Sequence, residues 1–419
     1  MPPVRKADET GHRAPPLRGV RVLDLSRVLA GPWAGQLLAD LGADVIKVER
    51  PGAGDEARAW GPPYLQDAAG RDTAESAYFL CTNRNKRSVT LDIAHPEGQA
   101  LVRRLAQQAD VLIENFKVGG LQQYGLDHHI LCALNPRLVY CSITGFGQTG
   151  PYAPRAGYDV LIQGMGGLMS VTGHPDGAEG AGPQKVGVAV TDIMTGLYAT
   201  VAVQAALAER DRSGLGQHID LALLDVQVAG LANQASNYLA GGVVPRRMGN
   251  AHPNIVPYED VPTADGDMIL AIGNNGQFGR FCAVAGHPEW AQDPRFASNS
   301  QRVSNRALLM PQLRQATVMH STRDWVAALE AAQVPCGPVN RLDEVFADAQ
   351  VRSRGLRIEM SHATAGTVPL VANPIRLSGS PVTYRLAPPT LGEHTDEVLH
   401  DLLGLEAPAL EALRTARII

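Results

Sequence analysis

The chain has few cysteines, few aromatic residues and little excess charge of either sign. Its 419 residues include five cysteines, and aromatic residues make up 5% of the sequence. The cysteines are widely spaced with no C-x-x-C pair, a pattern that indicates neither a metal site nor a disulfide framework and predicts reduced thiols in a cytoplasmic protein. The formal net charge is −5 with both signs mixed along the chain, so we expect no nucleic-acid partner.

Long hydrophobic runs and common cofactor motifs are also missing. The longest apolar stretches, near 197–207 and 221–232, contain Gln or Asp and are shorter than a bilayer span, so we expect no membrane partner. There is no P-loop, no H-E-x-x-H and no G-x-S-x-G. Gly164-Met165-Gly166-Gly167 lacks the spacing of a dinucleotide fingerprint, which argues against a nicotinamide cofactor. Adjacent histidines such as His128 and His129 are more often surface residues than ligands, so we expect no metal.

The residues that are present are those of a soluble globular enzyme, with 45% apolar and 19% charged residues. Strand-like and helix-like segments alternate along the first half of the chain. We expect strands at 20–25, 44–49, 88–93, 111–114, 138–143 and 217–221, and helices at 33–41, 97–109, 192–210 and from 224 onward. This alternation predicts an α/β fold with a doubly wound, Rossmann-like parallel sheet.

Two domains are expected, because 419 residues exceed one typical core. A region rich in Gly, Pro and Asn, 241–258, resembles a linker or a mobile active-site loop. The simplest layout is a large domain interrupted by a smaller, inserted α/β domain. The predicted boundaries are a disordered leader at 1–16, the large domain at 17–222, a linker at 223–249, the small domain at 250–330, and a linker and return to the large domain at 331–419.

Asp192 is the carboxylate with the most informative surroundings. The apolar run from Lys185 to Ala189 predicts a strand end that meets the start of a helix and would keep Asp192 out of bulk water. A partly desolvated carboxylate of this kind can act as a nucleophile toward an activated acyl group. The alternative is a helix cap, a position for which Asp is preferred. This segment alone favours the cap.

Several sequence blocks, in order from about Leu17 to the C-terminus, carry a more specific signal. They are the segments 18–24 and 42–51, Val28-Leu29-Ala30-Gly31-Pro32, Gly54-Asp55, Asn85-Lys86-Arg87-Ser88, Glu114-Asn115-Phe116, Gly157-Tyr158-Asp159, Pro335-Cys336-Gly337-Pro338-Val339 and Leu391-Gly392-Glu393-His394-Thr395. Together they resemble the family III CoA-transferases, the group that contains formyl-CoA transferase, carnitine CoA-transferase and methylacyl-CoA racemase.

The resemblance implies an acyl-CoA and a carboxylic acid as the substrates and Asp192 as the nucleophile. Asp192 would attack the thioester of a donor acyl-CoA, and the reaction would pass through an aspartyl-acyl anhydride and an aspartyl-CoA thioester. Such intermediates must be protected from water. The resemblance also implies an interlocked homodimer.

The same resemblance places coenzyme A just beyond the carboxyl ends of the predicted strands, where open α/β sheets bind ligands. The implied contacts are Leu29, Ala30, Arg50, Leu91, Asp92, Ile93, Ala94, Asn115, Phe116, Lys117, Ala156, Gly157, Tyr158 and Asp159. Arg50 and Lys117 have the right charge for the nucleotide phosphates. Two positions depart from formyl-CoA transferase: Leu29 replaces a glutamine, which argues against formate or oxalate, and Gln123 replaces an arginine.

Segments 248–258 and 273–278 are most similar to the branch that moves CoA from succinyl-CoA to dicarboxylic acids. Gly249, Asn250 and His252 fall in the family's loop near the acyl group, although the polyglycine run of formyl-CoA transferase is missing. A second carboxylate needs a cationic partner. The candidates are Arg84, Arg246, Arg247 and His252, which the sequence does not rank.

Three alternatives stay open at this stage. A racemase or epimerase of the same fold would pair the aspartate with a histidine, but Tyr158 occupies that position, and a tyrosine with an ordinary pKa near 10 is a poor base at neutral pH. A CoA-binding protein without turnover and a nicotinamide dehydrogenase are the other two. The missing dinucleotide fingerprint makes the dehydrogenase the weakest of them.

Overall fold

The structure is a computed structural model that describes residues 13–419. Most of the predicted leader, residues 1–12, lies outside the described residues. Within the described part, the amide of Arg13 donates to the carbonyl of Gly379 at 2.8 Å. The chain forms two compact units: one contains the residues through Gly167 together with Val186–Ser236 and Gln350–Ile419, and the other contains Leu168–Lys185 and Asn237–Ala349.

A six-stranded parallel sheet forms the centre of the first unit, with the strand order β5-β2-β1-β6-β7-β8. The strands are β1 Arg21–Asp24, β2 Asp44–Glu49, β5 Lys86–Thr90, β6 Val111–Glu114, β7 Val139–Thr144 and β8 His218–Ala222. The predicted α/β fold with a parallel central sheet is therefore confirmed. Two of the predicted strands, 44–49 and 111–114, have the bounds that the sequence indicates.

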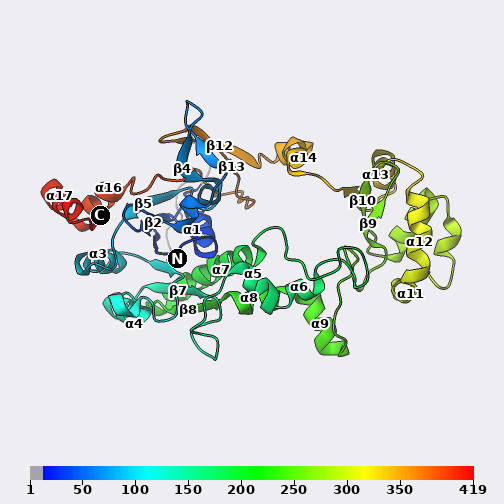
Figure 1. The fold of residues 1–419 in the computed structure, drawn as a ribbon, viewed down its shortest axis with the longest axis horizontal. Coiled ribbons are helices and arrows are strands. Elements are labelled where there is room, and N and C mark those ends of the chain that lie inside the picture. The colour runs from blue at the N-terminus through cyan, green and yellow to red at the C-terminus, as the bar shows by residue number, and fades with distance from the viewer. Residues whose placement is uncertain (1–12) are drawn as a thin grey trace. The chain divides into compact units, whose positions relative to one another are not determined.

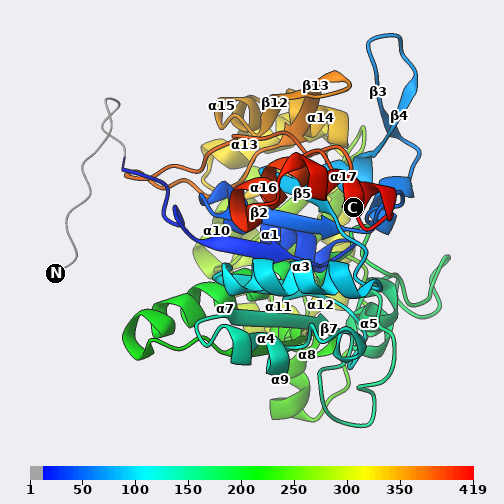
Figure 2. The ribbon, with the colours of Figure 1, turned by 90° about the vertical axis from the view of Figure 1, so that its left-hand side faces the viewer.

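Helices cover both faces of this sheet (Figure 1). On one face, a core that includes Leu23, Ile46 and Leu112 packs against α3 Pro96–Gln107, α4 His128–Leu134, α16 Thr395–Leu403 and α17 Ala407–Thr415. On the other face, a core that includes Val22, Val45 and Val111 packs against α1 Ala30–Asp40, α5 Asp159–Met165, α7 Val190–Ser213 and α8 Leu223–Gly230. Neighbouring strand residues point to opposite faces, so each strand is apolar on both sides. Figure 2 looks onto the first layer, with α3, α16 and α17 in front of the strands.

Helix α7 begins earlier than the sequence suggests. Residues Lys185–Ala189, predicted to end a strand, form no strand, and the 24-residue helix starts at Val190. The stretch near 197–207 was expected to be too short to cross a membrane. The whole helix α7, which contains it, is long and apolar enough to do so by length and composition, so this expectation is wrong for the helix. Its buried residues Ala199 and Val203 pack in the core beneath the sheet, as they do in core helices of globular proteins.

Smaller elements complete the first unit. They are η1 Glu56–Ala59, α2 Ala77–Leu80, η2 Gln122–Tyr124 and two antiparallel hairpins, β3 Tyr64–Gln66 with β4 Asp72–Ser76 and β12 Arg357–His362 with β13 Gly366–Val371. The region 223–249, predicted as a linker, contains α8 and α9 Ala232–Gly241. Both α9 and α15 Ala349–Ser353 lie where the chain passes between the units.

The second unit has its own antiparallel sheet, in the order β11-β10-β9, and its own core. The strands are β9 Tyr258–Pro262, β10 Asp267–Ala271 and β11 Cys336–Pro338. The helices are α6 Leu168–Val171, α10 Asn275–Val284, η3 Pro288–Ala291, α11 Asn299–Ser304, α12 Arg306–Thr317, α13 Thr322–Ala331 and α14 Leu342–Ala347. Phe278, Phe281 and Trp325 are buried between its sheet and helices.

Candidate active site

Two adjoining cavities lie beyond the carboxyl ends of β1, β2, β5 and β6 in the first unit. The larger has a volume of about 680 Å³, and the smaller, which contains Asp192, about 170 Å³. Arg27, Glu56, Phe116 and Lys117 line both, so these four residues form the boundary between them. A position beyond strand ends is where open α/β sheets bind ligands.

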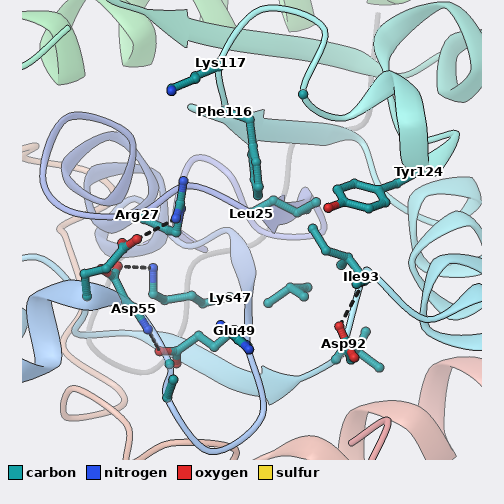
Figure 3. A pocket seen from close by; sticks show the side chains of 18 of the residues that line it. Leu25, Arg27, Lys47, Glu49, Asp55, Asp92, Ile93, Phe116, Lys117 and Tyr124 are labelled. Carbon is teal, nitrogen blue, oxygen red and sulfur yellow. Dashed lines mark hydrogen bonds and ion pairs between the residues drawn. The ribbon is translucent and has the colours of Figure 1, made fainter. Parts of the chain in front are cut away.

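The larger cavity brings together predicted contacts that are far apart in the sequence (Figure 3). The predicted residues in its lining are Arg50, Leu91, Asp92, Ile93, Ala94, Phe116 and Lys117. Gln123 also lines it, and its side-chain amide donates to the carbonyl of Gly120 at 3.0 Å. Arg50 and Lys117 supply positive charge, so the cavity can bind an anionic group next to its apolar wall.

A buried ion pair supports the floor of this cavity. Lys47 Nζ lies 2.9 Å from the Asp55 carboxylate, and both side chains are fully buried. Lys47 also donates to the Ser26 carbonyl at 2.9 Å. Charges this deep need partners, and the ion pair joins β2 to the segment that follows it. The hydrogen bond to Ser26 joins β2 to the loop that follows β1.

That loop contains a strained turn at Arg27 and Val28. Val28 has φ 73°, a left-handed conformation that a β-branched residue rarely adopts. Three hydrogen bonds to two neighbouring side chains hold it. The Arg27 amide donates to Asn115 Oδ1 at 2.9 Å, and Asn115 Nδ2 donates to the Arg27 carbonyl at 2.7 Å. The Val28 amide donates to Asp55. Asn115 was predicted to contact coenzyme A. Its side-chain amide positions this turn, and Asn115 also lines the smaller cavity. Strain of this kind persists where neighbours over-determine the backbone.

The turn places the Arg27 guanidinium at the boundary of the two cavities. It lies 4.8 Å from the centre of the Phe116 ring and forms an ion pair of 2.6 Å with Glu56. Phe116 is fixed in turn by Glu114, whose carboxylate accepts from the Phe116 amide at 2.8 Å. Burial raises the pKa of the Glu114 carboxyl to about 7. Figure 3 shows the Phe116 ring pointing toward Leu25, across from Lys47 and Asp55.

The smaller cavity gathers the remaining predicted contacts around Asp192. The predicted residues that line it are Leu29, Ala30, Asn115, Phe116, Lys117, Ala156, Gly157, Tyr158 and Asp192. Gly157 approaches Gly145 so closely that an added Cβ would lie 2.4 Å from the Gly145 Cα. Tyr158 is 63% exposed, so its side chain is free to contact a ligand.

Asp192 lies in the first turn of α7 and does not cap it. The N-cap residue is Ala189, which makes no side-chain capping bond, so the interpretation of Asp192 as a cap is wrong. The capping contacts come from Asp159, whose carboxylate accepts from the amides of Thr191 at 2.9 Å and Asp192 at 3.4 Å. Asp159 also accepts from Gln163 at 2.6 Å. It is the predicted contact in the first unit that lines neither cavity.

The environment of Asp192 makes its carboxyl unusually basic. Burial, followed by the negative charge of Asp159, raises the pKa of Asp192 to about 7. A carboxylate with a raised pKa is a stronger nucleophile than an ordinary surface aspartate, provided that it is deprotonated.

Gly249, Asn250 and His252 belong to the second unit. Gly249 has φ 64° and its amide donates to the Gly173 carbonyl at 3.0 Å, which ties the loop to the segment before Lys185. His252 Nδ1 accepts from the Asn254 amide at 3.0 Å, and burial lowers the pKa of His252.

The four candidate partners for a second carboxylate differ in what they already bind. Arg84 is buried and pairs with Asp40 at 2.6 Å, so it is not free for a ligand. Arg247 pairs with Asp176. Arg246 is exposed and makes no ion pair within residues 13–419.

Sequence reasoning missed several lining residues. The cavity of Asp192 is also lined by Arg27, Glu56 and Arg155. Sequence reasoning singled out residues next to each of them but not these three. The signal that could have found them is position, since Arg27 follows the first strand and Arg155 precedes Gly157-Tyr158-Asp159. No group of three or more His, Cys, Asp or Glu side chains in the described part of the chain is arranged to hold a metal ion.

Comparisons with known proteins identify the family of this chain. Residues 17–395 match the CoA-transferase family III profile. The chain is 55% identical to the succinate–glutarate CoA-transferase of Agrobacterium fabrum, with 95% of this chain and 98% of the relative covered, and 44% identical to the succinyl-CoA:glutarate CoA-transferase of Mus musculus, with 96% and 90% covered. The crystal structure of a CAIB/BAIF family protein from Brucella suis has a TM-score of 0.81 and 52% identity, with 93% of this chain and all of that chain covered. The chain is a CoA-transferase and belongs to CoA-transferase family III.

Proposed function

We propose that this enzyme moves CoA from succinyl-CoA to a second dicarboxylic acid, with Asp192 as the nucleophile. The names of two relatives, which are 55% and 44% identical to this chain, support the succinyl and glutaryl substrates. The observation that carries the role of Asp192 is its half-buried carboxylate in a cavity that shares a wall with the larger one.

The two cavities suggest how an acyl-CoA binds. The nucleotide occupies the larger cavity, where Arg50 and Lys117 face its phosphates. The pantetheine arm passes the boundary formed by Arg27 and Phe116 and brings the thioester to Asp192. Holding the thioester next to Asp192 raises the rate through proximity and orientation.

The reaction then proceeds by four acyl substitutions. An Asp192 carboxylate oxygen attacks the donor thioester carbonyl, a C–O bond forms, the C–S bond breaks, and CoA leaves as the thiolate. The thiolate attacks the Asp192 carbonyl of the anhydride and releases the donor acid as its carboxylate. The acceptor carboxylate attacks the resulting aspartyl thioester and expels the thiolate again. Finally the thiolate attacks the acceptor carbonyl, which releases the new acyl-CoA and restores Asp192.

The proposal includes two features that rest on the family resemblance. The anhydride is shielded from water, which would otherwise hydrolyse it. The enzyme acts as an interlocked homodimer.

The test is CoA transfer from succinyl-CoA to a panel of mono- and dicarboxylic acids, followed by mass spectrometry. We expect diacids to accept CoA and Asp192→Asn to reduce transfer to background while the circular dichroism spectrum is retained. Asp211→Asn, an exposed position on the same helix, is the matched control and should keep full activity. Trapping with hydroxylamine should modify wild-type Asp192 only when acyl-CoA is present. Normal turnover by Asp192→Asn would refute the mechanism.

A further inference from the structure

We propose that Arg155 binds the second carboxylate of the dicarboxylic acid while the first reacts at Asp192. The inference rests on the proposed function and assigns the residue that makes the enzyme selective for diacids. Its starting point is that Arg155 and Asp192 line the same cavity of about 170 Å³.

The charges in that cavity single out Arg155. Three cations line it, and Arg27 is neutralised by Glu56 at 2.6 Å. Lys117 also lines the larger cavity, where it faces the proposed nucleotide position. Arg155 lines the smaller cavity and not the larger one, and it forms no ion pair with any carboxylate within residues 13–419.

Aromatic rings hold the Arg155 guanidinium in place. Its carbon lies 4.6 Å from the centre of the Tyr152 ring and 5.1 Å from that of Phe146, and the two rings pack edge to face at 5.6 Å. Its one hydrogen bond in the described structure is a weak one of 3.8 Å to the Met165 sulfur. Stacking orients a guanidinium through its faces and leaves its N–H edge free for a planar anion.

A diacid needs such a partner. When one carboxylate has become an anhydride with Asp192, the other still carries a full negative charge in a cavity that already contains Glu56. A guanidinium can accept it as a bidentate pair, which fixes both the charge and the orientation of the acyl chain. A monocarboxylic acid of the same length places a methyl group there and leaves Arg155 unpaired. The position therefore discriminates between the two classes of acid.

The experiment compares self-exchange of a labelled acid into its own CoA ester, because each such reaction involves a single acid. Glutarate with glutaryl-CoA is the diacid pair, and pentanoate with pentanoyl-CoA is the monoacid pair of equal length. We expect Arg155→Gln to lower kcat/KM for glutarate exchange by about 10- to 100-fold, as for loss of a charged hydrogen bond. Pentanoate exchange should change by less than about threefold. Arg155→Lys keeps the positive charge but cannot form a bidentate hydrogen-bonded pair, so it should recover part of the glutarate activity.

Affinity for free CoA, measured by calorimetry, is the readout that needs no turnover. It should be unchanged in Arg155→Gln and weakened in Lys117→Gln, which should slow both exchanges alike. Arg137→Gln is the matched control, an exposed arginine outside both cavities that should leave all three quantities unchanged. Unaltered glutarate exchange in Arg155→Gln, or equal losses for both acids with weaker CoA binding, would overturn the inference. Failure of the wild type to exchange glutarate would instead overturn the proposed function.

Discussion

At the scale of single residues, Asp159 affects both the position of Asp192 and the pKa of its carboxyl. Asp159 accepts the amides at the start of α7, so it fixes the helix that carries Asp192. Its charge also contributes to the raised pKa of Asp192, after burial as the larger cause. A single carboxylate thus positions the nucleophile and makes it more basic.

The pH dependence of kcat/KM tests this pairing. Asp192 reacts when it is deprotonated, so activity should fall as the pH drops through about 7, the pKa of Asp192 in the free enzyme. Asp159→Asn keeps acceptor capacity near the α7 amides but removes the negative charge, so the acidic limb should move to lower pH. The shift should be partial, because burial remains. A lower kcat at every pH with an unmoved limb would mean that Asp159 acts only on the helix.

Every site residue predicted in the first unit except Asp159 lines one of the two cavities, but the sequence did not predict the contacts that position these side chains. Leu29, Arg50 and Tyr158 follow from their places in family motifs. The left-handed turn at Val28 could not be predicted, because valine disfavours it and the groups that enforce it, Asp55 and Asn115, are distant in sequence. Arg155 resembles an ordinary surface arginine until its cavity is known.

At the scale of elements, the site depends on how closely α1 and α7 cross. An added Cβ at Gly196 of α7 would lie 2.7 Å from the carbonyl oxygen of Ala30 and 3.0 Å from the Trp33 side chain. Both neighbours belong to the start of α1, next to Leu29. The glycine therefore sets the distance between the helix that carries the nucleophile and the wall that faces it.

Gly196→Ala should separate the two helices. We expect a loss of about 1–3 kcal/mol in the free energy of unfolding, typical of overpacking, together with a lower kcat. Gly279→Ala in α10 is the matched control, because a Cβ there meets nothing within 4 Å. That variant should gain up to about 1 kcal/mol from helix propensity. Urea unfolding measures both, and equal effects of the two substitutions would contradict the close crossing.

The observed bounds of the elements show which local sequence signals were sufficient to predict a helix or strand. β2 and β6 lie where the sequence predicts them, because a short apolar run encodes each. The hairpin β3–β4 was missed because its strands, such as Asp72–Ser76, are short and polar. Residues 186–189 are apolar but form no strand, since no neighbouring strand pairs with them.

At the scale of the whole first unit, buried charges join its distant segments. The Arg58 guanidinium binds Glu49 at 2.8 Å and Glu75 at 2.6 Å and donates to the carbonyl of Pro389. Lys86 pairs with Asp24 at 2.9 Å, with both side chains fully buried. These contacts connect β1, β2 and β5 with the last part of the chain. A buried pair costs much to break, because the remaining charge is left without a partner.

The buried carboxylates fall into two groups that predict how stability varies with pH. The pKa values of Asp24, Glu49 and Asp55 are lowered by their cationic partners against the opposing effect of burial, so their contribution is present above about pH 4 and is lost as the pH falls further. The pKa values of Glu114 and Asp192 are raised to about 7, so they stabilise the fold when protonated and lose that contribution as the pH rises through about 7.

Glu114 and Asp192 should therefore raise the melting temperature as the pH is lowered from about 8 to about 5, against the opposite contribution of His218, whose pKa burial lowers to about 4. Below about pH 4 the melting temperature should fall. Asp192→Asn should flatten the upper part of this curve, because the amide does not titrate. Asp24→Asn should lower the melting temperature at neutral pH, since it leaves Lys86 without its anion, and should weaken the acid-induced fall. Asp211→Asn, an exposed position on α7, should leave the curve nearly unchanged. A melting temperature that varies with pH identically in wild type and Asp192→Asn would show that Asp192 titrates as an ordinary solvated aspartate, and the physical basis for its role as nucleophile would be lost.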